Sequence, residues 1–162
     1  MKFIILLFNI ILLNTMTINA QNAEQPIITG TFSDSITQSN WFSEWLKING
    51  ESIINVNDAN ELKTLLSEDV FFKIYLGTWC EDSQVYVPVL LDLIEGSNCK
   101  FEIIGVNREK ECPFKPKECK SWDIEFVPTI KVFRNDKELG RIIEAPKESI
   151  SKDLIDLLRQ DK

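Results

Sequence analysis

The hydrophobic positions of this 162-residue chain form short runs of strand type, separated by stretches with helical spacing. Runs rich in β-branched and aromatic residues predict buried strands. We expect strands at Ile27–Phe32, Ser52–Val56, Val70–Leu76, Phe101–Val106, Thr129–Arg134 and Glu138–Glu144. Val70–Leu76 has the composition of a central strand, and the turn signal Asn135-Asp136 predicts a hairpin between the last two strands.

Apolar residues three and four positions apart predict the helices. We expect them at Trp41–Ile48, Ala59–Ser67, Cys80–Ile94 and Ser151–Arg159. Asn57 or Asp58 can cap the second helix, and Pro88 is expected to kink the third. Strands and helices alternate in the first half of the chain, which favours parallel strand pairing, whereas the hairpin implies an antiparallel pair. The predicted fold is α/β, with a mixed central sheet and helices on both faces.

The first twenty residues differ from the rest of the chain. Lys2 is the only charged residue among them, Phe3–Leu13 is apolar apart from Asn9, and a small residue, Ala20, ends the segment. This pattern predicts a secretory signal peptide over residues 1–20, cleaved after Ala20. The alternative is an uncleaved membrane anchor, although the apolar run is short for a membrane span. We therefore expect an exported protein, periplasmic or secreted, without stable membrane insertion after cleavage.

Composition narrows the range of functions. The formal net charge of −7 argues against a nucleic-acid partner, because such proteins need a basic surface. The chain has no histidine, which removes the commonest general base and metal ligand. Its four cysteines lack the paired close spacings of a zinc site. We expect no metal and no cofactor.

Three motifs together carry a resemblance to a known family. The stretch Trp79-Cys80-Glu81-Asp82-Ser83, with Pro88 after it, resembles the active-site helix of thioredoxins. Val127-Pro128-Thr129 resembles their cis-proline loop, and residues 133–140 are similar to their last hairpin. The resemblance covers roughly residues 52–159. It implies a thioredoxin fold, with an N-terminal extension over residues 21–50 containing a short helix and a thioredoxin-like domain over residues 51–162.

The position of Cys80 fits the chemistry that the resemblance implies. A thiol attacks a disulfide only as the thiolate, and the first turn of a helix favours the thiolate through its unpaired N–H groups and dipole. Cys80 follows a strand and opens a helix, and Trp79 is expected to shield one side of it. The resemblance also implies a cis Val127–Pro128 bond against the sulfur, with the Val127 backbone open to an extended substrate chain.

The chain departs from the thioredoxin pattern in three places. Ser83 replaces the second cysteine, which excludes dithiol reduction at one Cys-x-x-Cys pair, although its hydroxyl can donate a hydrogen bond to the Cys80 thiolate. Many thioredoxins carry a buried acid six residues before the first cysteine, where this chain has Ile74. Glu81 and Asp82 oppose a nearby negative charge, but acids at a helix start are also explained as helix stabilisers.

The other three cysteines have separate interpretations. Cys99 begins a strand at the edge away from Cys80 and is expected to be a buried structural thiol. Cys112 and Cys119 lie in the loop after that strand, on the edge that carries Cys80. They are interpreted as a structural disulfide that clips the loop, as a remote resolving thiol for Cys80, or as free thiols.

Three functional hypotheses follow. In the first, Cys80 alone forms mixed disulfides with protein thiols or disulfides, as an isomerase or thiol-capture protein, and an envelope reductase or small thiol recycles it. The second is a non-catalytic binding module on the same fold. In the third, the protein is a reductase that uses Cys112 or Cys119 as the resolving thiol.

Overall fold

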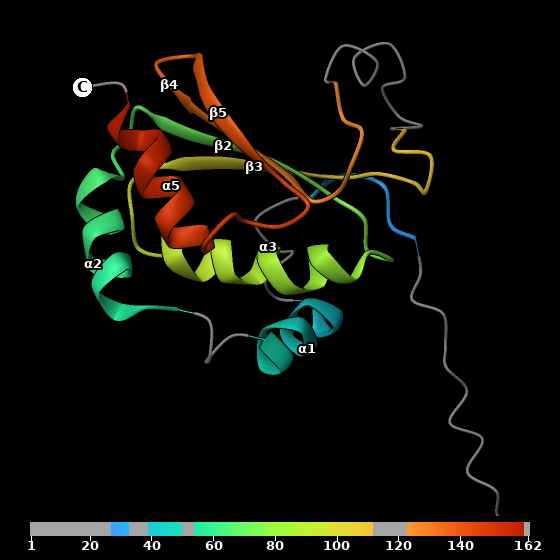
Figure 1. Ribbon diagram of the computed structural model, residues 1–162. Helices are drawn as coiled ribbons and strands as arrows, with labels where there is room; N and C mark the ends of the chain where they lie inside the picture. The colour runs from blue at the N-terminus through green and yellow to red at the C-terminus, as the bar shows by residue number, and fades with distance from the viewer. Residues whose placement is uncertain (1–26, 33–38, 50–53, 112–122, 161–162) are drawn as a thin grey trace, which may run out of the picture.

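The computed structural model describes residues 27–32, 39–49, 54–111 and 123–160. Within these ranges, strands and helices follow one another in the order shown in Figure 1. The elements are β1 (Gly30–Phe32), α1 (Asn40–Asn49), α2 (Val56–Leu65), β2 (Val70–Leu76), α3 (Glu81–Ile94), β3 (Lys100–Gly105), β4 (Thr129–Arg134), β5 (Lys137–Ile143) and α5 (Ile150–Arg159).

The strands form one five-stranded sheet in the order β1-β3-β2-β4-β5. β2 and β3 are parallel, and the other neighbouring pairs are antiparallel. The predicted α/β class with a mixed sheet is confirmed. β2 lies at the centre because its apolar side chains are buried from both sides: Ile74, Tyr75 and Leu76 are each at most 1% exposed. This central position brings the chain that leaves β2 to the middle of one sheet edge.

The predicted strand at Ser52–Val56 is wrong at its end, because Val56 is the first residue of α2. Asn55 adopts an extended conformation and its Oδ1 accepts hydrogen bonds from the amides of Asn57 and Asp58, at 2.9 and 3.3 Å. Asn55 therefore caps the helix in place of Asn57 or Asp58. The outer strand next to β3 is instead β1, which pairs antiparallel to it, with Thr31 opposite Ile104.

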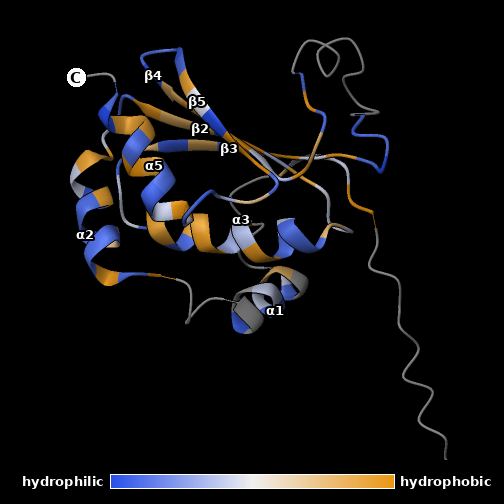
Figure 2. Cartoon of the chain, in the orientation of Figure 1, coloured by the Kyte–Doolittle hydropathy of each residue, from blue (hydrophilic) through white to orange (hydrophobic). Residues whose placement is uncertain are grey.

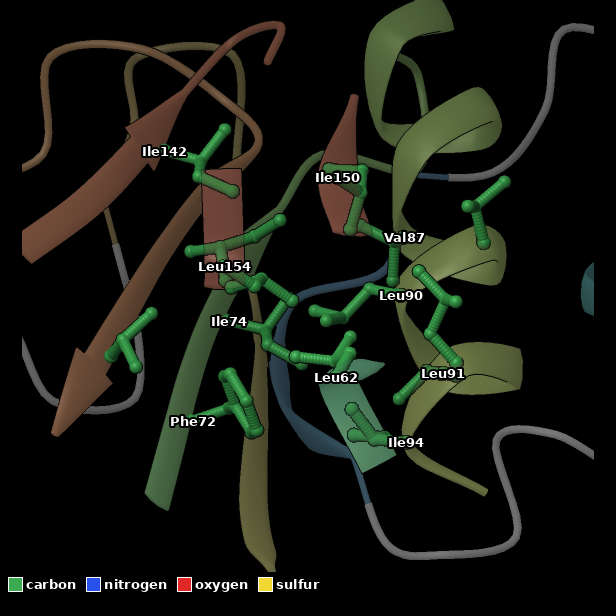
Figure 3. Packing of buried hydrophobic residues seen from close by; sticks show 14 of the residues in the cluster. Leu62, Phe72, Ile74, Val87, Leu90, Leu91, Ile94, Ile142, Ile150 and Leu154 are labelled. Atoms are coloured by element: carbon green, nitrogen blue, oxygen red, sulfur yellow. The ribbon is translucent and has the colours of Figure 1, made fainter. Parts of the chain in front are cut away.

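The described helices gather on one side of the sheet (Figure 1). α2, α3 and α5 pack against one another there, and α1 packs against α3. Their buried residues join those of β2 and β4 in one core, in which Leu62, Ile74, Leu90 and Leu154 lie together (Figure 3). We predicted helices on both faces; residues 112–122, between β3 and β4, lie outside the described part.

The other face of the sheet carries a row of charged side chains across four strands. Register places Lys73 between Glu102 and Lys131, and Lys131 beside Arg141. Lys73 forms an ion pair with Glu102 at 3.3 Å, and the Lys131 ammonium lies 5.7 Å from the ring centre of Tyr75. Burial lowers the pKa of Lys131, and the nearby Arg141 lowers it further. The two faces of the sheet thus differ in polarity.

α3 begins one residue later than predicted, with Cys80 as its N-cap, and ends at Ile94. Its first turn is hydrophilic and its later turns are largely hydrophobic (Figure 2). Pro88 is buried inside the helix, which continues past it. The polar first turn reaches the sheet edge, while the apolar turns pack on the core.

Within the described residues, no helix is both long enough and apolar enough to cross a membrane.

Candidate functional site

Cys80 stands where the chain leaves the central strand and enters α3. Its backbone is extended, with φ −96° and ψ 122°, and its amide donates to the Gly77 carbonyl at 2.9 Å. The Cys80 carbonyl accepts the first helical hydrogen bond, from Gln84, at 3.1 Å. The Cys80 side chain makes no capping hydrogen bond to the first turn. The sulfur is therefore next to helix amides that a negative charge can use.

Val127 and Pro128 lie opposite the sulfur. The Val127–Pro128 peptide bond is cis, as predicted. The half-buried Cys80 thiol donates a hydrogen bond to the Val127 carbonyl, with 3.1 Å between sulfur and oxygen. The Thr129 hydroxyl donates to the Phe126 carbonyl at 2.7 Å, which fixes the turn that presents Val127. The structure thus brings together three of the residues that the sequence singled out.

Trp79 is held on three sides. Its Nε1 donates to the Val106 carbonyl at 3.4 Å, and the Arg108 guanidinium lies 5.1 Å from the ring centre. A Cβ added to Gly77 would lie 2.7 Å from Trp79 Cε2, so only glycine allows the ring this close to the backbone. Trp79 and Cys80 both pack against a small buried cluster that includes Val127. The indole therefore forms one wall beside the sulfur.

Ser83 supports the loop before Cys80. Its side chain is fully buried, and its Oγ accepts a hydrogen bond from the Gly77 amide at 3.3 Å. Among the described residues, the Ser83 hydroxyl and the Cys80 thiol share no hydrogen bond. The hydrogen bond that Ser83 could donate to a Cys80 thiolate therefore stays a prediction.

Sequence reasoning missed two polar residues that hold the same loop. The buried Thr78 hydroxyl accepts a hydrogen bond from the Ile28 amide at 3.1 Å, which ties the loop to the segment before β1. Gln84 Nε2 donates to the Thr78 carbonyl at 3.1 Å. Their adjacency to Trp79 and Ser83 in the sequence was the only available signal, because both contacts depend on the folded loop.

The charged residues that directly follow Cys80 are acidic. Glu81 and Asp82 occupy the first turn of α3 and are exposed to solvent. At this end of a helix carboxylates interact favourably with the dipole, although they repel a thiolate on the neighbouring residue. A cation also lies at the site, because the Arg108 guanidinium contacts the ring of Trp79.

The remaining cysteines lie apart from this arrangement or outside the described residues. Cys99 directly precedes β3, at the sheet edge that lies away from Cys80. It is half-buried, and its sulfur lies 2.9 Å from Ser97 Oγ. Burial raises the pKa of Cys99, and the contact with Ser97 opposes part of that rise. Cys112 and Cys119 lie outside the described residues, so their predicted disulfide remains a prediction. Among the described residues, no group of three or more cysteine, aspartate or glutamate side chains is arranged to hold a metal ion.

Comparisons with known proteins support a thioredoxin-like relationship. No family model matches the chain. Thioredoxin H9 of Arabidopsis thaliana is 24% identical over 85 residues, which are 52% of this chain and 56% of the relative. The match therefore spans about half of each protein.

Two solved structures share the fold. One is a Pseudomonas aeruginosa protein of unknown function, with a TM-score of 0.56 and 15% identity over 78% of this chain and 87% of that one. The other is an HIV epitope-scaffold, with a TM-score of 0.52 and 16% identity over 77% of this chain and 86% of that one. At these identities the likeness concerns the fold alone.

Proposed function

We propose that this protein is an exported, thioredoxin-like thiol–disulfide exchange protein that acts through Cys80 as a single nucleophile. Its substrates are protein thiols or disulfides. The observation that carries the proposal is the position of the Cys80 sulfur, at the amino end of α3 and 3.1 Å from the Val127 carbonyl. Ser83 in place of a second cysteine makes net reduction by a local dithiol impossible, so isomerisation or thiol capture is the activity that fits.

The exchange step needs only thiols. The Cys80 thiolate attacks one sulfur of a substrate disulfide; a Cys80–substrate S–S bond forms, the substrate S–S bond breaks, and the second substrate sulfur leaves as a thiolate. A thiolate from the substrate, or from a small thiol or envelope reductase, then attacks the mixed disulfide and releases Cys80. When the attacking thiolate belongs to the same substrate, no electrons are gained or lost, and the outcome is isomerisation.

The residues around Cys80 have separate parts in this proposal. Loss of the thiol proton removes the hydrogen bond to the Val127 carbonyl, and the unpaired amides of the first turn of α3 can then stabilise the negative sulfur. Trp79 excludes water from one side. An extended substrate segment lies along Val127, whose backbone is next to the sulfur.

We also propose that the protein is exported, because residues 1–20 have the pattern of a signal peptide. The test is expression of the full chain with its own leader, followed by mass determination of the product in the cell envelope or medium. We expect a mature chain that begins at Gln21. A full-length product retained in the cell, with no cleaved form, would contradict export.

The decisive experiment measures mixed disulfides formed with a scrambled, disulfide-bonded protein. Cys80→Ser should abolish covalent adducts, whereas Cys99→Ser, the matched control at the other sheet edge, should retain them. Ser83→Cys should shorten adduct lifetime, because a resolving thiol is then present. Adducts that persist unchanged in Cys80→Ser would reject the assignment. In the native chain, an intramolecular disulfide between Cys80 and Cys112 or Cys119 would favour the reductase alternative.

One observation favours a non-catalytic binding module as the second candidate. The thiol proton of Cys80 is engaged by the Val127 carbonyl, and two exposed carboxylates follow it. A thiol that acts as a hydrogen-bond donor within the fold has a structural role that needs no redox chemistry. Alkylation of Cys80 at the rate of an ordinary free cysteine, together with full substrate binding by Cys80→Ser, would support this candidate over exchange chemistry.

A further inference from the structure

The sheet edge away from Cys80 contains a cavity of about 480 Å³ between α1, the end of α3 and the start of β3. Its apolar walls include Phe42, Leu91, Ile94 and Phe101. Phe42 is fully buried and belongs to the main core, so this wall is part of the folded body. The volume is in the range that accepts a small organic molecule.

Asp92 and Glu95 line the same cavity at the carboxyl end of α3. The last turn of α3 has no basic residue, although the negative end of a helix dipole is stabilised by cations. Neither carboxylate forms an ion pair with another described residue. Lys63 of α2 lines a neighbouring hollow with both acids without reaching ion-pair distance. Two carboxylates and the helix dipole therefore make this end of the cavity electronegative.

We propose that this cavity binds a small organic monocation with an apolar body. The carboxylates and the helix end attract the ammonium group, while the apolar part lies against Leu91 and Phe101, and the ring of Phe101 also favours a cation over its face. An anionic ligand is excluded by charge. The site is independent of the exchange chemistry, because it lies at the opposite end of α3 from Cys80.

Cys99 provides the means to test the proposal, because its thiol lines the cavity. The probe is benzyltrimethylammonium, which keeps its charge at every pH. It is compared with neopentylbenzene, in which carbon replaces the nitrogen. The readout is the rate of Cys99 alkylation by iodoacetamide in the full chain at alkaline pH, with peptide mapping to separate Cys99 from the other three cysteines.

The cation should slow alkylation at Cys99 in a saturable manner and leave Cys80 unaffected. The neutral compound should need about three- to tenfold higher concentration for half-protection, because exposed carboxylates each contribute a modest factor. In D92N/E95Q the cation should lose that advantage while the neutral compound binds as before. The control, E148Q/D156N, makes the same change of net charge at exposed acids outside the cavity and should behave as the native chain.

Two results would overturn the proposal. Failure of both compounds to protect Cys99 would show that the cavity is not a binding site. Equal protection by the cation and the neutral compound, unchanged in D92N/E95Q, would show that the carboxylates do not select a cation. Either result leaves the Cys80 chemistry untouched, since exchange activity is not part of the measurement.

Discussion

The two ends of α3 each have a half-buried thiol nearby, and they differ in almost everything else. Cys80 is the N-cap, next to unpaired helix amides and the Val127 carbonyl. Cys99 follows the carboxyl end, beside Ser97, Asp92 and an apolar cavity. Because solvent exposure is similar, accessibility alone does not distinguish the two sulfurs. We therefore expect the backbone groups around each sulfur, rather than its exposure, to decide which thiol reacts as a nucleophile.

The largest effect is expected from a substitution in the core that holds the two ends of α3 in place. Leu90 is fully buried in the core between the two ends, and Leu90→Ala should lower the free energy of unfolding by about 2–5 kcal/mol. Chemical denaturation measures the loss, and the two thiols should approach the same alkylation rate at the lower denaturant concentration at which this variant unfolds. Val56→Ala, at a site 70% exposed, is the control and should change stability by less than about 0.5 kcal/mol. Equal losses in the two variants would contradict this description of the core.

The second prediction concerns pH. Burial raises the pKa of Cys99, so its thiolate fraction at neutral pH is small and grows about tenfold per pH unit until the pH reaches that raised value. We expect Cys80 to react faster than Cys99 at neutral pH, with the ratio falling as the pH rises toward the raised pKa of Cys99. Alkylation rates at each peptide across a pH series provide the measurement. A faster Cys99 at neutral pH would reverse the comparison.

The third prediction concerns the packing of Trp79 against Gly77, beside Cys80. Gly77→Ala adds a methyl group 2.7 Å from Trp79 Cε2, so the ring must move and lose its hydrogen bond to the Val106 carbonyl. The cost should be about 1–3 kcal/mol of unfolding free energy, with altered tryptophan fluorescence. Trp79→Leu made together with Gly77→Ala should recover part of that cost, measured as a double-mutant cycle. Strict additivity of the two changes would mean that the ring does not depend on Gly77.

The smallest effect is expected at the Cys99 end. Burial raises the pKa of Cys99 and the Ser97 contact lowers it in part, so Ser97→Ala should raise the pKa further. At a fixed neutral pH, alkylation of Cys99 should slow about two- to threefold, while Cys80 is unchanged. The midpoint of the pH–rate profile separates this effect from a change in access. A midpoint that moves to lower pH would contradict it.

The sequence predicted those elements that local pattern determines. The bounds expected for β2 and β4 agree with the structure, because both are continuous runs of strand-forming residues that lie in the interior of the sheet. Ser52–Val56 was misread because its apolar residues also suit a helix start, and the side chain of Asn55 stabilises that start. β1 lies within the strand expected at Ile27–Phe32 but is only three residues long, because its bounds depend on pairing with β3.

The candidate site was predictable only in outline. The meeting of Cys80 with Val127 followed from the resemblance, through the order of a strand, a cysteine and a Val-Pro pair. The hydrogen bond between Ser83 and the Gly77 amide could not be predicted, because it forms only when the loop turns back toward Ser83. The cavity beside Cys99 was equally hidden, since its walls come from α1, α3 and β3, which are far apart in the sequence.

The length of α3 has a consequence for oxidation of the chain. Its 14 residues extend about 21 Å at ~1.5 Å per residue, whereas a disulfide requires Cα atoms within about 7 Å. Cys80 and Cys99 therefore cannot be crosslinked within one folded molecule. An intramolecular bridge between them, found after oxidative stress, would be a covalent record that the molecule had unfolded before it was oxidised.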